Sequence, residues 1–114
     1  LNHELVKRTR DKFKINPNYS LAGAYILTKM MADGIVKANS TDVPKVIAAM
    51  EGTTYDGLTG KETIRKEDHQ VIKNYYLLKG KAKASMKDKD DYCDIVHGGQ
   101  SFLTPEQAGC KMPA

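Results

Sequence analysis

The sequence has little arginine. Only three of its 18 basic residues are arginines, at positions 8, 10 and 65, whereas arginine is the side chain best suited to bidentate recognition of phosphates and guanines. The net charge of +4 therefore comes mostly from lysine. We expect a solvated lysine surface and no nucleic-acid partner, since clustered arginine and lysine mark such interfaces.

Long apolar runs and a leader are also lacking. The longest apolar stretch, Ala22 to Leu27, stops at Thr28 and Lys29, well short of the roughly 20 residues that a membrane span requires. The N-terminal segment is polar and begins with Leu, unlike a secretory signal. We expect an internal start, as in a processed or truncated chain, and 114 residues allow one domain or less.

Motifs of catalysis are absent. The sequence contains no G-x-S-x-G elbow and no glycine-rich phosphate fingerprint. His3, His69 and His97 are scattered and stand in no recognisable nucleophile arrangement. We therefore expect no enzyme and no cofactor. A small hydrolase that uses His97 or His69 is an alternative that the loss of activity in a His97→Ala variant would support.

Three helices are predicted. Apolar residues in a charged background indicate a first helix that Pro17 would stop. A second runs from Ser20, its predicted N-cap, to about Lys37, and it is apolar on more than one side, which is typical of a helix buried in a larger body. The third follows Thr41 and Asp42, with a proline in its first turn and Gly52 at its far end.

After Gly52 the periodicity changes to that of strands. The runs KETIR (61–65) and QVIKNYYLLK (70–79) flank a polar turn and predict a hairpin within Tyr55 to Lys79. Beyond Lys79 only a short strand at Tyr92 to Val96 is predicted, within an otherwise irregular tail through Ala114. The fold class is thus α/β, with three helices, a hairpin and a tail. A lone hairpin needs other elements to cover it.

Cys93 and Cys110 are the only cysteines, which permits one disulfide or two free thiols. We favour a Cys93–Cys110 disulfide, because a bridge would order a tail that has little else to hold it, provided that the compartment is oxidising. A zinc site from Cys93, His97 and Cys110 is a weaker alternative that lacks a fourth ligand. No metal is expected.

Two features are candidates for binding. Tyr19 and Ser20 stand at a helix start, where backbone N–H groups can receive a carboxylate. The run KGKAKASMKDKDDY (79–92) is rich in lysine but mixes both signs, which favours an exposed loop. An interaction module whose lysine-rich tail binds an acidic partner is therefore kept as the alternative function.

The order of the segments is more specific than any one of them. The stretches NPNYSLAGAY, ANSTDVPKVIAAMEGTTYDGLTGKETIRKEDHQ and YYLLKG follow a basic helix. This order resembles the C-terminal third of a periplasmic substrate-binding protein of the type I, leucine/isoleucine/valine-binding kind, which serves an ABC importer. The resemblance extends from about His3 to Gly80 and is most specific between STD and DHQ.

The resemblance implies a two-lobed α/β receptor that closes over a small ligand about a hinge. Residues 1–79 would belong to one lobe, up to a hinge at Tyr75 and Tyr76, and residues 80–114 would form the return from the hinge and the tail. The ligand contact before the long helix falls on Tyr19 or Ser20.

The partners implied are an amino acid or related carboxylate and the membrane permease of an ABC transporter, with a periplasmic location. This chain alone is expected to bind ligand poorly, because most of the pocket walls would lie elsewhere. Its uncovered apolar faces are expected to favour self-association.

Overall fold

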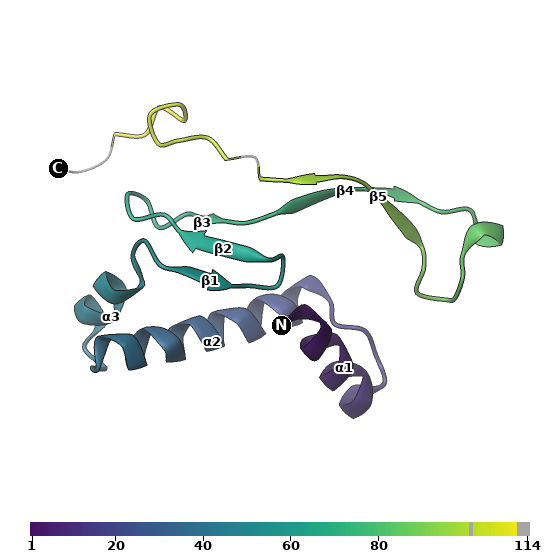
Figure 1. Cartoon of the computed structure of the whole chain (residues 1–114), viewed down its shortest axis with the longest axis horizontal. Coiled ribbons are helices and arrows are strands. Elements are labelled where there is room, and N and C mark those ends of the chain that lie inside the picture. Colours follow the sequence, from purple (N-terminus) through teal and green to yellow (C-terminus); the bar gives the residue numbers. More distant parts are fainter. Residues whose placement is uncertain (101, 112–114) are drawn as a thin grey trace.

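The protein combines three helices with two small antiparallel sheets (Figure 1). The computed structural model describes residues 1–100 and 102–111. The helices are α1 (Asn2–Phe13), α2 (Tyr19–Ala38), α3 (Val43–Met50) and a short 3-10 helix, η1 (Lys83–Ser85). The strands are β1 (Thr54–Asp56), β2 (Lys61–Ile64), β3 (Val71–Ile72), β4 (Tyr75–Gly80) and β5 (Cys93–Gly99). The predicted mixed α/β class with three helices is confirmed. Within the described part of the chain, no helix is long and apolar enough to cross a membrane.

Local chemistry sets the helix ends. Helix α2 begins one residue before the predicted N-cap, because the side chain of Asn18 accepts the Leu21 N–H at 2.9 Å. The prediction of Ser20 as N-cap is therefore wrong. At α3 the predicted cap is confirmed, since the Asp42 carboxylate accepts the Lys45 N–H. Gly52 follows this helix with φ of 69°, the left-handed conformation that glycine was predicted to supply there.

The first sheet has the order β1-β2-β3, with Tyr55 opposite Glu62 and Ile64 opposite Val71. The KETIR strand is confirmed as β2. The predicted hairpin is observed as the antiparallel pairing of β2 with β3. Strand β1 was not predicted, and it adds a third strand beside β2. Turn residues between β1 and β2 include Gly57 and Gly60, which fits a hairpin connection.

The single strand predicted at residues 70–79 is wrong, because it divides into β3 and β4, which belong to different sheets. The break lies at Lys73 and Asn74. Asn74 donates from its backbone to Thr59 Oγ1 at 3.2 Å and from its carboxamide to Thr59 O at 2.8 Å. These bonds tie the chain to the β1–β2 turn, so β4 leaves the first sheet.

Strand β4 pairs with β5 in a long ribbon (Figure 1). The predicted strand at Tyr92 to Val96 is observed later and longer, as Cys93–Gly99. Its extension through two glycines depends on the partner strand: the Tyr76 ring lies so close that a Cβ on Gly98 would be 2.9 Å from Tyr76 Cδ1. The glycine pair that disfavours a strand in isolation thus permits this pairing.

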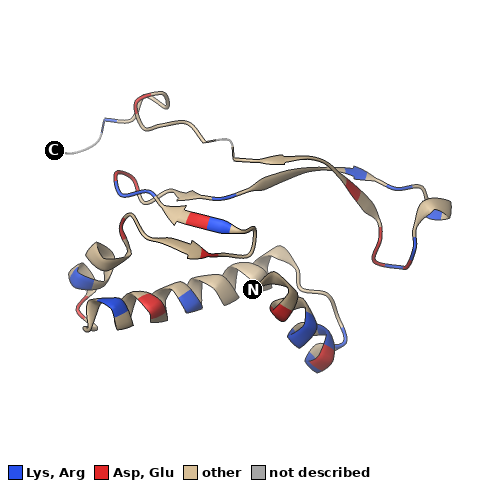
Figure 2. Cartoon of the chain, in the orientation of Figure 1, with Lys and Arg blue, Asp and Glu red and all other residues tan. Residues whose placement is uncertain are grey.

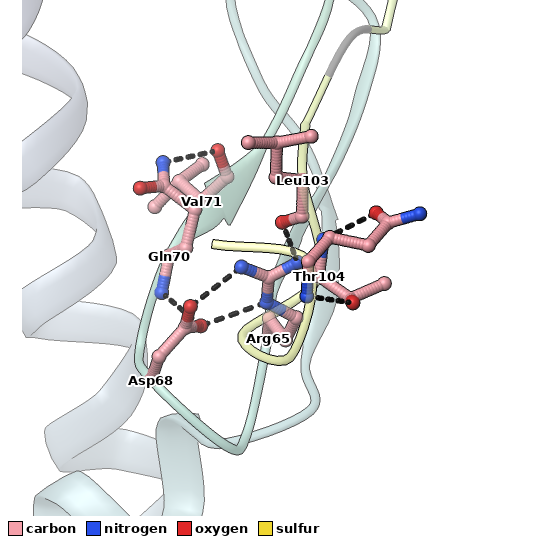
Figure 3. A network of polar contacts seen from close by, with 7 residues as sticks. Arg65, Asp68, Gln70, Val71, Leu103 and Thr104 are labelled. Atoms are coloured by element: carbon pink, nitrogen blue, oxygen red, sulfur yellow. Dashed lines mark hydrogen bonds and ion pairs between the residues drawn. The ribbon is translucent and has the colours of Figure 1, made fainter. Parts of the chain in front are cut away.

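The tail contacts Arg65, which directly follows strand β2 of the first sheet (Figure 3). Arg65 Nε and Nη2 donate to the two carboxylate oxygens of Asp68, at 2.8 and 2.5 Å, and Nη1 donates to Leu103 O at 2.9 Å. Thr104 and Gln107 then exchange hydrogen bonds across one turn. Residues 102–111 of the tail are irregular as predicted, and residues 101 and 112–114 lie outside the described part.

The chain buries little of its apolar surface against itself. Among the described residues, the buried hydrophobic core consists of Leu5, Met30, Val46 and Ile64. Its radius of gyration is 17.5 Å, against about 13 Å for a compact domain of this length. On α2, predicted to be largely buried, Val36 is 79% exposed and Leu27 63%. Helices and sheets therefore present faces that this chain does not cover.

Candidate functional site

A cavity of about 370 Å³ lies where α1, the start of α2 and the β4–β5 connection meet. Its wall combines apolar and aromatic side chains with amides and one pair of opposite charges. The lining residues are Asn2, Leu5, Val6, Arg10, Asn16, Pro17, Asn18, Tyr19, Ala22, Asp90 and Tyr92. This volume falls in the range of small-molecule pockets, which mix an apolar lining with a few polar groups.

The charged pair comes from segments that are distant in sequence. Arg10 Nη2, on α1, lies 3.5 Å from Asp90 Oδ2, on the β4–β5 connection. Arg10 Nε also donates to Asn16 Oδ1 at 2.5 Å. Figure 2 shows the charges of α1 and of this connection on neighbouring parts of the structure. The guanidinium is thus contacted by Asn16 of the α1–α2 turn and by Asp90 of the β4–β5 connection.

Lys81 stabilises the conformation of the β4–β5 connection. Its ammonium contacts Asp91 Oδ1 at 2.5 Å and Asp94 Oδ1 at 3.1 Å, and its backbone N–H donates to Tyr92 O at 2.9 Å. The hydrogen bond to Asp91, followed by that to Asp94, raises the pKa of Lys81. Part of the positive charge in the lysine-rich run is therefore used internally, which weakens the case for that run as a docking tail.

Tyr19 and Ser20 occupy the first turn of α2. Tyr19 lines the cavity and is 89% exposed, whereas Ser20 is exposed and is not part of the lining. The Asn18 side chain already takes the Leu21 N–H, so one backbone donor of this turn is occupied. Arg10 and Asp90 were not singled out from the sequence. The scarcity of arginine was the only sequence feature that pointed to Arg10. No local pattern connects it with Asp90, which lies 80 residues further along the chain.

Comparison with known proteins decides the family. Residues 1–86 match the family model described as periplasmic binding protein. The chain belongs to the periplasmic binding protein family. An amino acid ABC transporter substrate-binding protein from Pseudomonas fluorescens Pf-5 is 50% identical to it, over 96% of this chain and 29% of that protein, with a TM-score of 0.89.

Two further solved structures are similar to this binding-protein chain. An ABC transporter protein from Rhodopseudomonas palustris shares 37% identity over 74% of this chain and 26% of its own, with a TM-score of 0.60. An ABC-type branched-chain amino acid transporter from Rhodopseudomonas palustris CGA009 shares 29% identity over 97% and 28%, with a TM-score of 0.70. No match was found among curated proteins.

The chain spans less than a third of the length of these solved relatives. It corresponds to part of a periplasmic binding protein. Members of this family bind and do not catalyse, so the expectation that the chain is not an enzyme is confirmed by its membership.

In this binding-protein chain, Tyr75 and Tyr76 lie just after the point where the two sheets separate. The Tyr75 ring lies 5.5 Å from that of Phe102, and Tyr76 Oη is 3.4 Å from Thr59 O. Both residues begin β4, directly after Asn74, which is hydrogen-bonded to Thr59 of the first sheet's β1–β2 turn. They therefore lie at the junction between the three-stranded sheet and the β4–β5 ribbon.

The predicted Cys93–Cys110 disulfide is not formed, and both cysteines are free thiols. Strand β5 carries the chain away from Cys93 over seven residues, which is about 20 Å, and the tail continues in the same direction (Figure 1). A disulfide requires Cα atoms about 4.4 to 6.8 Å apart. The tail is instead held by Arg65 and by the Tyr75–Phe102 contact.

The zinc alternative fails on the same geometry. Cys93 and His97 are both on β5, and four residues of strand separate Cα atoms by about 13 Å. Of the other histidines, His3 is exposed on α1 and His69 contacts Glu51 Oε1 at 2.9 Å. The structure does not bring the three histidines together, so it gives no support to a hydrolase site.

Proposed function

We propose that this chain is the C-terminal portion of a type I solute-binding protein of an ABC importer, of the leucine/isoleucine/valine-binding kind. The intact protein captures a small ligand, an amino acid or related carboxylate, without chemistry and delivers it to a membrane permease. We propose that this work takes place in the periplasm, which the description of the family supports. No nucleic acid takes part.

The observation that carries the proposal is the likeness to the Pseudomonas fluorescens protein. Half of the residues are identical across nearly the whole chain, and the two folds agree with a TM-score of 0.89. That protein is named as an amino acid ABC transporter substrate-binding protein. Agreement of this kind over helices, sheets and tail together supports a shared role rather than a shared fold alone.

The uncovered faces fit a chain that completes a larger receptor. On the β4–β5 ribbon, Leu77, Leu78, Ile95 and Val96 are each more than half exposed, and a two-stranded ribbon is marginal without further cover. We propose that other parts of the receptor cover these faces. When the chain is isolated, the same faces would favour self-association.

The separation of the two sheets supports a division into lobes. We propose that residues 1–79 belong to one lobe and that residues 80–114 form the return and the tail, with Tyr75 and Tyr76 at the hinge. The contacts of Asn74 and Tyr76 with Thr59 would anchor the hinge to the first lobe. We further propose Tyr19 and Ser20 as ligand contacts, Tyr19 through its ring in the cavity wall.

A hybrid receptor tests this function. In it, the present chain replaces the corresponding segment of the Pseudomonas fluorescens protein. Isothermal titration with L-leucine, L-phenylalanine, L-glutamate and L-lysine should show saturable binding of at least one of them. The isolated chain, titrated at the same concentration, should show binding at least about tenfold weaker, because most of the pocket walls are then missing.

Tyr19→Ala in the hybrid should weaken binding, whereas Phe13→Ala, another exposed aromatic that lines a different groove, should leave affinity unchanged. A hybrid that shows one cooperative thermal transition and yet binds none of the four amino acids would contradict the proposal. An isolated chain that binds as tightly as the hybrid would contradict the view that the walls lie elsewhere.

A further inference from the structure

One face of α1 carries basic side chains as far as the end of the helix. They recur every three or four residues, a spacing that places them on one side of a helix, and all of them are exposed. The two residues that α1 buries, Leu5 and Thr9, lie on the opposite side. The basic face, which therefore points away from the buried side of α1, consists of His3, Lys7, Arg10 and Lys14.

Where α1 ends, this face borders a hollow of about 530 Å³ between the α1–α2 turn and the β4–β5 connection. Three cations and one carboxylate are part of its wall. The lining residues are Arg10, Lys14, Ile15, Asn16, Lys89 and Asp90. The carboxylate contacts Arg10, whereas neither Lys14 nor Lys89 makes an ion pair with any residue that the structure describes. The hollow thus has an excess of positive charge that these residues do not neutralise.

An apolar side chain lies among these charges. Ile15 is 57% exposed and lines the same hollow. Docking surfaces of proteins combine an apolar contact with a polar rim, and here both occur within one concavity. A concave surface receives a protruding loop, whereas a flat lipid surface would reach only its edges. The shape therefore favours a protein partner, and the charge favours a partner that presents carboxylates.

We propose that the surface formed by Arg10, Lys14, Ile15 and Lys89, the basic docking surface, receives an acidic loop of the membrane permease. Carboxylates of that loop would pair with Lys14 and Lys89, and an apolar side chain beside them would contact Ile15. Because the α1–α2 turn and the β4–β5 connection form the hollow together, the loop contacts both segments at once. This inference rests on the proposed function and deepens it by assigning the surface through which the receptor binds its partner.

The charges of the basic docking surface differ from that of Lys81 in the lysine-rich run. Lys81 contacts Asp91 and Asp94, whereas Lys14 and Lys89 are exposed. Exposed charges at the rim of an interface act mainly on the rate at which the partners associate, and salt screens them. The basic docking surface should therefore accelerate association with the permease at low ionic strength and lose this effect as salt is added.

The test measures binding of the hybrid receptor, saturated with an amino acid that it binds, to the permease of the Pseudomonas fluorescens transporter. The permease is held in nanodiscs of zwitterionic phosphatidylcholine, and biolayer interferometry gives the association and dissociation rates. Reversing both charges in Lys14→Glu/Lys89→Glu should slow association at low salt by about tenfold or more and change the dissociation rate by less. Neither lysine lines the Tyr19 cavity, so the affinity for the amino acid should stay within about twofold.

Lys45→Glu/Lys66→Glu is the matched control. It makes the same change in net charge at two exposed lysines, one on α3 and one in the β2–β3 turn, which line neither the hollow nor the Tyr19 cavity. Its association rate should stay within about threefold of that of the unmodified hybrid. Equal slowing in the two double variants would show only an effect of net charge and would overturn the assignment.

The remaining outcomes separate this inference from the proposed function. Unchanged association in Lys14→Glu/Lys89→Glu would overturn the inference, as would a hybrid that binds an amino acid but not the permease, and both results leave ligand capture intact. Equally fast binding to empty nanodiscs that contain anionic phosphatidylglycerol would indicate a lipid occupant and would also overturn it. A hybrid that binds none of the amino acids would contradict the proposed function itself and remove the partner named here.

Discussion

Glu62 is the most buried charged residue among those described, and its surroundings predict what its removal would do. Only 4% of it is exposed. Its Oε1 accepts from Thr59 N at 2.9 Å and from Thr59 Oγ1 at 2.8 Å, and its Oε2 accepts from Tyr55 Oη at 2.9 Å. Burial, followed by the hydrogen bond to Glu62, raises the pKa of Tyr55. One carboxylate thus closes the β1–β2 turn.

Replacing Glu62 with alanine removes the acceptor of three donors. A hydrogen bond to a charged group contributes about 1.5 to 3 kcal/mol, but Thr59 and Tyr55 are half-buried and water can reach them after the change. We expect a loss of about 2 to 4 kcal/mol in the free energy of opening the turn. Glu62→Gln should cost about 1 kcal/mol, because its oxygen keeps both Thr59 bonds and the Tyr55 hydroxyl can rotate to accept.

Gly57 supplies an independent check. A Cβ on Gly57 would lie 2.0 Å from Glu62 Cδ, so Gly57→Ala must displace the carboxylate, at a cost of about 1 to 3 kcal/mol. In the Glu62→Ala background this overlap is gone, and Gly57→Ala should cost much less. The two substitutions should therefore show a clear coupling energy in a double-mutant cycle.

Amide hydrogen exchange measures these effects locally, in the chain itself. The reporters are Gly57 N–H, which donates to Gly60 O at 2.8 Å, and Ile64 N–H, which donates to Thr53 O at 3.0 Å. Their protection factors should fall by about 30-fold or more in Glu62→Ala. If the unmodified chain protects these amides by less than that, both should exchange at the rate of an unprotected amide in the variant. Unchanged protection in Glu62→Ala, or an equal cost of Gly57→Ala in both backgrounds, would refute the reasoning.

Two further predictions concern the tail. The hydrogen bond from Arg65 lowers the pKa of Asp68 from 3.8 to about 2, so the Arg65–Asp68 ion pair that orients the tail-binding guanidinium should be complete above about pH 4 and be lost as the pH falls through about 2. An NMR titration of the Asp68 carboxyl should show this value, and Arg65→Ala should move it towards 3.8; an ordinary value in the unmodified chain would contradict the ion pair. The two cysteines should react with a thiol reagent without prior reduction, Cys110 faster because it is exposed. A mass lower by the two hydrogen atoms that disulfide formation removes would contradict the free thiols.

The sequence predicted those elements whose causes are local. The ends of α3 follow from Asp42, from the proline in its first turn and from Gly52, all within two residues of the helix. The N-cap of α2 was misplaced by two residues, because Asn18 and Ser20 are both good caps and the choice depends on where the preceding turn ends. The mixed α/β class followed from the change of periodicity after Gly52.

The failures share a different cause. The division of residues 70–79 into two strands depends on bonds between Asn74 and Thr59, 15 residues apart. The length of β5 depends on its pairing with β4, and the free thiols depend on the direction in which β5 carries the chain. Periodicity reports the preference of a segment and cannot report contacts with distant residues.

The same distinction explains why the sequence pointed to a family more readily than to a site. The most specific part of the resemblance, from STD to DHQ, coincides with the cap of α3, the Glu62 turn and the Arg65–Asp68 pair, each of which is satisfied within a few residues. These contacts hold the scaffold and none of them lines the Tyr19 cavity.

The Arg10–Asp90 ion pair joins α1 to the β4–β5 connection, and Asp90 lies beyond residue 86, where the match to the family model ends. A scaffold motif is therefore expected to be shared by receptors of different ligands, whereas residues 87–92 of the connection lie outside the family pattern. Exchanging residues 87–92 between this chain and its relatives should therefore leave the fold unchanged, which the thermal transition of the hybrid receptor would check.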